Sequence, residues 1–224
     1  MNSPNLTYED GFLSEKECTD LLAYFSTKVP FMHSEHFLFN RECKSSVLYC
    51  WITDTGLPYI FGKSMTNELK PYPFSDFPEI DAIRKRVEEK TGRKFNSVLI
   101  NRYDDGTTSL GAHADNDAWL GDSFIVPSVS IGAARFFDVT PKSASYRTKR
   151  DSSRKDVKEE KFRYVLKSGS LVVMGEGMQK DWYHAIPKQV KAIDDSGKRL
   201  KTDTGLRINL TFRDVKEDLA KFMQ

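Results

Sequence analysis

Two stretches in the first 95 residues place apolar side chains at helical spacing. Residues 14–25 open with a capping box, in which Ser14 is the N-cap and Glu17 reaches back to it, and apolar residues then recur every three or four positions. Residues 78–92 begin with a proline, repeat isoleucine, isoleucine and valine at apolar positions of one face, and end in a glycine that can close a helix. The pattern predicts two amphipathic helices.

Beyond residue 96 the pattern changes to short β-rich segments separated by turns, and residues 46–52 are one earlier segment of this kind. Residues 31–40 are aromatic but irregular, while residues 142–160 and 194–204 are polar and are expected to be loops. Two helices followed by about seven strands predict a β-sandwich with helices packed on one sheet. The seven expected strands cover residues 97–103, 125–132, 135–140, 163–167, 170–174, 182–187 and 206–213.

Length and composition fit one folded domain. The chain has 224 residues, of which 39% are hydrophobic and 12% aromatic, and we expect a monomer. No apolar run approaches the ~20 residues of a membrane span, and the N-terminus lacks a signal-peptide pattern, so we expect an intracellular protein without a membrane partner. Three cysteines without metal-site spacing also favour a reducing compartment.

The net charge of +2 is distributed unevenly along the chain. Residues 141–164 contain nine Lys or Arg and four Asp or Glu, a local charge of +5, which leaves −3 for all other residues. A basic segment of this kind can contact the phosphates of a nucleic acid, but it can equally be a solvated loop. Composition leaves both interpretations open.

The segment from His113 to Asp117 contains the first candidate for chemistry. Residues i and i+2 of an extended backbone share a face, so His113 and Asp115 can bind one metal ion together. Of the three remaining histidines, only His184 lies in a sequence typical of a buried strand, and it is the candidate for a third ligand. Two histidines and one carboxylate with open positions suit non-haem Fe(II) that activates oxygen. Because a His-x-Asp sequence also occurs by chance, other residues must decide whether this one is a metal site.

Residues 207–213 alternate strictly between polar and apolar side chains, so one face of this strand is expected in the core. The other face can be bathed in water, or its two arginines, Arg207 and Arg213, can bind both ends of a small dicarboxylate through their planar donor groups. Asn101 and Tyr103 share a face of another expected strand and can offer neutral donors to the same acid.

Together these segments resemble the AlkB family of Fe(II)- and 2-oxoglutarate-dependent dioxygenases. The resemblance covers about residues 98–213, where Asn-x-Tyr, His-x-Asp, Tyr-His and Arg-x-Asn-x-Thr-Phe-Arg occur together in the family's order and spacing. The segments that carry it are residues 99–103, 113–117, 129–132, 169–174, 182–184 and 207–213.

The resemblance implies a mainly β (α+β) fold, the double-stranded β-helix or jelly-roll, with two N-terminal helices packed on one sheet. It divides a single domain into a helical and nucleotide-lid region (1–95) and a jelly-roll core (96–213) with a basic insertion (141–163) that is longer than in compact family members. It also implies Fe(II), 2-oxoglutarate and O2 as cofactors. The positions that match the iron ligands are His113, Asp115 and His184, and those that match the 2-oxoglutarate site are Asn101, Tyr103, Arg207, Asn209, Thr211 and Arg213.

The same resemblance suggests residues that contact the substrate. Asp117 matches a position that faces the exocyclic amine of the target base in several family members. Tyr59 and Trp51 lie where the nucleotide-recognition lid of the family begins, and an aromatic face there can stack on an extruded base. Arg102 is a further candidate for substrate contact.

The implied function is oxidative demethylation of N-alkylated bases, such as 1-methyladenine and 3-methylcytosine, in DNA or RNA, with release of formaldehyde, succinate and CO2. An alternative is hydroxylation of a nucleoside, a small metabolite or a protein side chain on the same fold. A third possibility is a nucleic-acid-binding module without catalysis, and the complete set of ligand positions counts against it. The sequence does not distinguish DNA from RNA, or single from double strands.

Overall fold

We analysed a computed structural model, which describes residues 3–38, 40–59, 61, 64–115, 118–121, 123–142 and 161–216. Strands dominate the chain, and the principal helices are α1 (Glu15–Lys28) and α2 (Pro78–Thr91). The α4 turn (Met178–Asp181) and two 3-10 turns, Phe74–Asp76 and Ala118–Leu120, are short. No helix among the described residues has both the length and the apolar composition needed to cross a bilayer.

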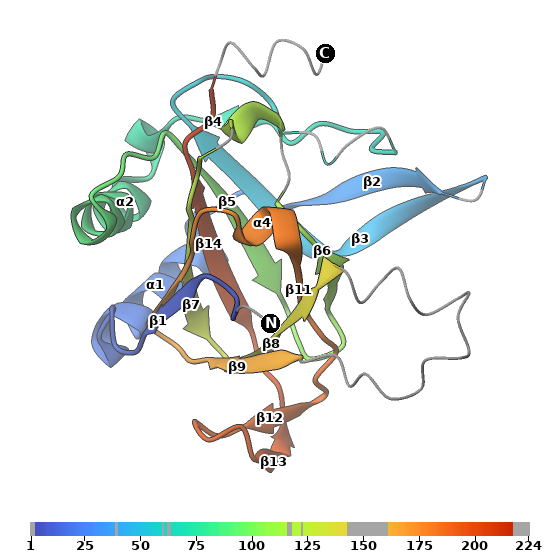
Figure 1. Ribbon diagram of the computed structural model, residues 1–224. Coiled ribbons are helices and arrows are strands. Elements are labelled where there is room, and N and C mark those ends of the chain that lie inside the picture. Colours follow the sequence, from blue (N-terminus) through green and yellow to red (C-terminus); the bar gives the residue numbers. More distant parts are fainter. Residues whose placement is uncertain are drawn as a thin grey trace.

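The larger sheet has eight strands, and its central strand in space is β14 (Arg207–Arg213), the last in sequence (Figure 1). Its order is β1-β10-β7-β14-β5-β3-β2, with β4 beside β3. All pairings along this path are antiparallel. The other members are β1 (Leu6–Glu9), β2 (Met32–Leu38), β3 (Arg41–Thr53), β4 (Pro71–Tyr72), β5 (Ser97–Tyr103), β7 (Val126–Gly132) and β10 (Ser170–Met174).

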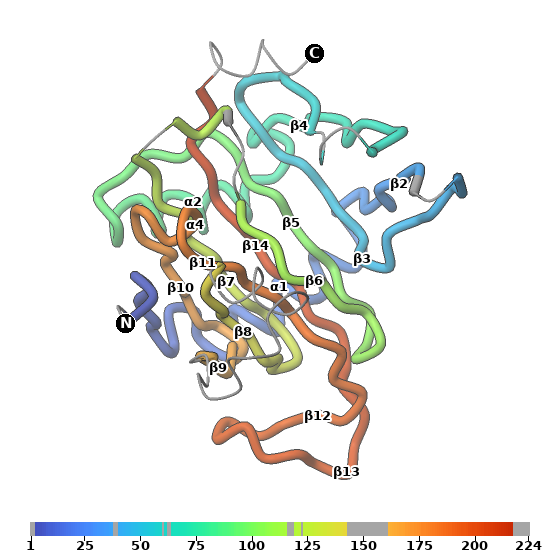
Figure 2. The backbone as a smooth tube through the Cα atoms, turned by 45° about the vertical axis from the view of Figure 1, so that its right-hand side comes forward, coloured from blue at the N-terminus to red at the C-terminus, as the bar shows by residue number. Residues whose placement is uncertain are grey.

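A four-stranded antiparallel sheet packs against the larger one, in the order β6-β11-β8-β9. A separate hairpin, β12 with β13, projects from the body of the molecule (Figure 2). The strands are β6 (Leu110–His113), β8 (Arg135–Pro141), β9 (Phe162–Leu166), β11 (Trp182–Ile186), β12 (Lys191–Ile193) and β13 (Arg199–Asp203).

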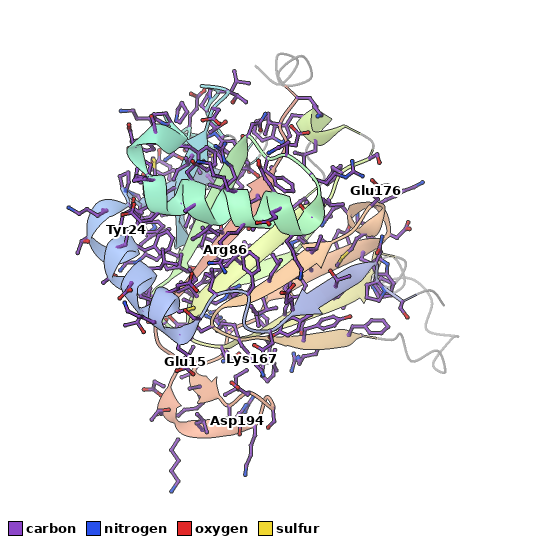
Figure 3. All side chains as sticks on the ribbon, turned by 90° about the vertical axis from the view of Figure 1, so that its left-hand side faces the viewer. Glu15, Tyr24, Arg86, Lys167, Glu176 and Asp194 are labelled. Atoms are coloured by element: carbon purple, nitrogen blue, oxygen red, sulfur yellow. The ribbon has the colours of Figure 1, made fainter. Side chains whose placement is uncertain are left out.

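Helices α1 and α2 cover the outer face of the larger sheet, where their apolar stripes meet the apolar residues of the strands. Phe25 of α1 and Ile83 of α2 lie in one buried cluster with Leu210 of β14. Figure 3 shows Arg86 between the two helices, where its guanidinium forms an ion pair with Glu17. The two helices and two sheets confirm the expected jelly-roll with helices on one sheet.

Most of the predicted elements are confirmed. Ser14 caps α1 through a capping box, Gly92 closes α2 with a left-handed backbone, and each of the seven predicted strands begins and ends within one residue of the observed one. One expectation is wrong: residues 194–204, expected to be a loop, contain β13. Residues 31–40, for which no element was predicted, contain β2. Residues 143–160 of the polar insertion lie outside the described residues.

Candidate metal and dicarboxylate site

Two histidines face one another across neighbouring strands of the smaller sheet. His113 at the end of β6 is the register partner of His184 in β11, and their ring centroids are 4.2 Å apart. The Nδ1–H of His113 can donate to the Gly111 carbonyl at 2.8 Å, which leaves Nε2 free to bind a metal. The His113 side chain is 34% exposed and that of His184 is 8% exposed, so the pair lies at the mouth of an interior site.

Asp115 follows β6 and completes a triad. One carboxylate oxygen lies 3.6 Å from Nε2 of His113 and 4.0 Å from Nε2 of His184. The ligand atoms of the three residues all lie within 4.8 Å of one another. The main-chain N–H of Asp115 donates to the side-chain oxygen of Gln179 at 2.9 Å, and Nη2 of Arg213 lies 3.3 Å from its second carboxylate oxygen. Two imidazoles and one carboxylate that converge in this way fit a divalent transition metal.

The protonation states of the buried ligands suit metal binding. Burial and the neighbouring His113 lower the pKa of His184 to about 3, so its imidazole is neutral at physiological pH. Burial opposes ionisation of Asp115, but Arg213 and the two histidines hold the pKa of its carboxyl below the usual range. A neutral imidazole and an ionised carboxylate are the forms that bind a metal.

A cavity of about 480 Å³ opens beside the triad, between the two sheets. One wall is a row of polar residues on neighbouring strands of the larger sheet, because Arg207 pairs with Tyr103, Asn209 with Asn101, and Thr211 with Ser128. Their apolar neighbours on the same strands point to the helices, as the alternation predicts.

Arg207 is fully buried, and among the described residues it has no acidic partner. Its Nη2 donates to the Ser130 hydroxyl at 3.0 Å, while Nε and Nη1 lack a hydrogen-bond partner in the described part of the chain. The side-chain oxygen of Asn101 is also buried without such a partner. Unpaired polar atoms of this kind are costly unless a ligand satisfies them, and a buried guanidinium calls for an anion.

Another part of the cavity lining, the aromatic end, consists of aromatic rings. Tyr59 and Phe61 meet edge to face at 4.7 Å between ring centroids, and Phe61 lies at the same distance from Tyr49. His36, Lys44 and Ser45 of the β2–β3 hairpin complete this end. One cavity therefore joins a polar, cationic wall, a metal triad and an aromatic end.

Comparison with known proteins assigns the family. The profile of the 2OG-Fe(II) oxygenase superfamily matches residues 5–213, nearly the whole chain. The chain belongs to this superfamily. The oxygenase is 31% identical to the "DNA oxidative demethylase ALKBH2" of Arabidopsis thaliana, over 93% of this chain and 66% of that protein. These matches confirm the resemblance to AlkB-type dioxygenases.

Two further relatives and one solved structure agree with this placement of the oxygenase. The human protein of the same ALKBH2 name is 36% identical over 72% of this chain and 54% of its own length. The human "Alpha-ketoglutarate-dependent dioxygenase alkB homolog 3" is 28% identical over 93% of this chain and 65% of its own length. The chain thus spans about half to two thirds of these relatives. "The structure of OsALKBH1" has the same fold, with a TM-score of 0.56 at 16% identity, and the match covers 96% of this chain and 100% of that one.

Not all residues predicted for substrate contact in this oxygenase line the cavity. Tyr59 does, although it is only 3% exposed. Trp51 points into the core, where its indole N–H donates to the Leu57 carbonyl at 2.8 Å. Arg102 points to the opposite side of β5 from the cavity and forms an ion pair with Asp104. Asp117 lies outside the described residues.

Several residues of the oxygenase site were not identified from the sequence. Ser128 and Ser130 alternate with apolar residues on β7, and this alternation in the sequence marks them as one polar face of the strand. Gln179 gives no comparable signal, because it lies in a four-residue helical turn and reaches Asp115 across 64 positions of sequence. Phe61 follows the predicted Tyr59 by two residues and lines the same aromatic end.

Proposed function

We propose that this chain is an Fe(II)- and 2-oxoglutarate-dependent dioxygenase that oxidatively demethylates N-alkylated nucleobases in DNA or RNA. The observation that carries the proposal is the triad of His113, Asp115 and His184, which shares one cavity with a buried cationic wall and an aromatic end. The ALKBH2 names of relatives that share 31% and 36% of residues support the choice of substrate.

In this proposal His113, Asp115 and His184 hold Fe(II) by two imidazole nitrogens and one carboxylate oxygen. Bound Fe(II) would supply the activation of O2 that couples decarboxylation of 2-oxoglutarate to succinate and CO2 with hydroxylation of the N-methyl carbon. The hydroxymethyl group so formed would leave the base as formaldehyde. The chain's own contribution is to place the reactants and exclude water. Arg213 holds the Asp115 carboxylate ionised and in place.

The polar wall is proposed to bind 2-oxoglutarate. Arg207 provides unpaired donors for a terminal carboxylate, and Asn101 and Tyr103 lie beside it on β5. Asn209 is fixed by donating to the Ser128 hydroxyl at 2.6 Å and to the Val129 carbonyl at 3.0 Å. A rigid donor set of this kind loses little conformational entropy when the dicarboxylate binds. Thr211 and Arg213 continue the wall toward the metal triad.

The aromatic end is proposed to receive the alkylated base. The rings of Tyr59 and Phe61 offer faces and edges against which a flipped base can pack. The prediction that Asp117 contacts the base remains a proposal from the family resemblance. Trp51 and Arg102 are left out of this proposal, because neither lines the cavity.

The test is a mass-spectrometric assay of oligonucleotides that carry 1-methyladenine or 3-methylcytosine, with Fe(II), ascorbate and 2-oxoglutarate. We expect loss of the methyl group together with formation of succinate, and no turnover in His184→Ala, because one metal ligand is missing. His33→Ala is the matched control, since His33 is exposed and does not line the cavity. Succinate formation that methylated oligonucleotides do not stimulate would favour hydroxylation of a small molecule or protein instead.

A further inference from the structure

Arg135, the first residue of β8, is a second fully buried arginine near the proposed dicarboxylate wall. It does not line the cavity. Its guanidinium lies over the ring of Tyr103, with 5.6 Å between the guanidinium carbon and the ring centroid. Arg207 lies over the same ring at 5.0 Å. Two guanidinium groups therefore flank one phenol in the interior.

Main-chain carbonyls hold Arg135 in place. Nη1 donates to Asp105 at 3.2 Å, and Nη2 donates to Thr108 and Pro187, both at 2.8 Å. The main chain on either side of Arg135 is fixed by Gln189, whose side chain accepts from the Phe136 N–H and donates to the Ala134 carbonyl, each at 2.9 Å. The position of the buried charge is thus fixed before any ligand binds.

The positive charge of Arg135 has no buried counter-charge in the described part of the chain. The acid that acts on it, Asp105, is exposed, and its carboxylate already accepts from Thr107 and Thr108. Burial, reinforced by the like charge of Arg207, lowers the pKa of Arg135 to about 10. Two buried cations that have no buried acid as a partner of their own are unfavourable. A dianion on the polar wall would offset both.

We propose that Arg135 is a positioning residue for the dicarboxylate: it supplies a second buried positive charge, behind Tyr103, that strengthens binding of a dianion without touching it. The inference rests on the proposed function, which places 2-oxoglutarate on the wall beside Arg207. Charge–charge attraction extends beyond contact distance in a poorly solvated interior. Arg135 therefore favours a ligand with two negative charges over a similar ligand with one.

Calorimetric titration of the Mn(II)-loaded protein with 2-oxoglutarate and with 2-oxopentanoate, which lacks the distal carboxylate, tests this inference. We expect Arg135→Gln to raise the Kd for 2-oxoglutarate about tenfold, or about 1.4 kcal/mol, and the Kd for 2-oxopentanoate clearly less. Arg135→Lys keeps the charge but loses the planar donor set, so it should melt at a lower temperature yet retain most of the affinity for 2-oxoglutarate. Arg163→Gln is the matched control, because Arg163 is paired with Asp138 and half exposed.

The outcomes separate this inference from the proposed function. A wild-type protein that does not bind 2-oxoglutarate contradicts the proposed function. A wild-type protein that binds it, with equal affinity in Arg135→Gln, overturns only the role of Arg135. Parallel losses for both ligands, or the same loss in Arg135→Lys as in Arg135→Gln, show that the arginine acts through its hydrogen bonds alone and also overturn the proposal. If Arg135→Gln does not fold, Arg135→Met, which also removes the charge, takes its place in both titrations and is judged by the same criterion.

Discussion

The orientation of each side chain at the metal site depends on the groups that contact it from behind. His113 can be oriented by a hydrogen bond to a carbonyl two residues earlier in its own strand, and Asp115 by Gln179 and Arg213. His184 has no such partner for Nδ1 among the described residues and is held by burial between His113 and Phe137. The imidazole that is most deeply buried is therefore oriented by packing.

Asp138 lies on β8, next to the strand β11 that carries His184, and its charge stabilises the smaller sheet. It accepts from Arg163 at 2.6 and 2.8 Å, and Lys161 lies 2.6 Å away. Burial opposes its ionisation, but these two cations hold the pKa of its carboxyl below the usual range. Its register partner is Ala185, the residue after His184.

Replacing Asp138 by Asn is expected to lower the free energy of unfolding by about 1 kcal/mol at pH 7, an amount reduced by solvent around the half-exposed cations. A carboxyl with a lowered folded-state pKa stabilises the protein above its unfolded pKa, and this contribution is lost as the pH falls through the folded value. The difference in melting temperature between wild type and Asp138→Asn should therefore shrink below about pH 4. Asp20→Asn, at an exposed pair on α1, should show no such difference. A gap that persists unchanged at acid pH contradicts the assignment.

At the level of whole elements, the alternation of β14 was predicted but the environment of its polar face was not. A polar face on a strand is consistent with solvent or with a ligand cavity, and only the packing of the second sheet decides between them. All seven residues of β14 are buried, because helices cover one face and the smaller sheet encloses the other. The proposed ligand positions themselves could be taken from the sequence, since four local motifs carry them: Asn-x-Tyr, His-x-Asp, Tyr-His and Arg-x-Asn-x-Thr-Phe-Arg.

Two of the strands that sequence reasoning missed, β2 and β13, have weak apolar patterns. All five residues of β13 are exposed, so this hairpin strand has no buried face to mark it. β2 mixes histidines and a glutamate with its apolar residues, and it pairs with β3 over a register irregularity after His33. Trp51 was assigned to the lid from its position in sequence, yet its stacking on Trp119 depends on a segment 68 residues later.

The α4 turn and the loop after β6 form one unit through Gln179, which is 3% exposed. Gln179→Leu removes the acceptor of the Asp115 N–H, and we expect metal affinity to fall roughly 10- to 100-fold, as for other outer partners of metal ligands. Gln189→Leu is the matched control, because it removes a similarly buried side-chain amide that accepts a hydrogen bond from the main chain of β8 and not from Asp115. Both variants should lose stability, but only the first should weaken Mn(II) binding in a titration. Equal metal affinities in the two variants would remove Gln179 from the site.

In the molecule as a whole, the excess positive charge is concentrated in the segment between β8 and β9. This basic insertion (141–163) joins two strands of the same sheet that carries His113 and His184 (Figure 1). The prediction that it contacts the phosphate backbone comes from its composition, since residues 143–160 lie outside the described part of the chain. Lys161 and Arg163, at the end of the insertion, are held by Asp138.

If the insertion binds phosphates, affinity for a single-stranded oligonucleotide falls with salt at a slope of roughly −0.7 per contact. Replacing Arg147, Lys149, Arg150 and Arg154 together by Gln should flatten the slope and weaken binding in fluorescence anisotropy. Turnover at saturating oligonucleotide should be retained, because the variant leaves the metal triad intact.

The matched control removes four charges from the region of the β12–β13 hairpin, which projects from the body of the molecule (Figure 2). Replacing Lys188, Lys198, Arg199 and Lys201 by Gln should leave the salt slope unchanged. If the two fourfold variants change the salt slope and the oligonucleotide affinity equally, the oligonucleotide responds only to the total charge of the protein. The insertion is then an ordinary solvated loop.

The central place of β14 in the larger sheet has a consequence for synthesis on the ribosome. β5 and β7 both pair with β14 and lie on either side of it, yet they begin 110 residues and 81 residues before it in the sequence. Until β14 leaves the exit tunnel, the nascent chain carries two strands with open edges and no common partner, the state in which chaperones bind and aggregation begins. β14 also carries Arg207, so the proposed dicarboxylate wall forms only when this strand joins the sheet.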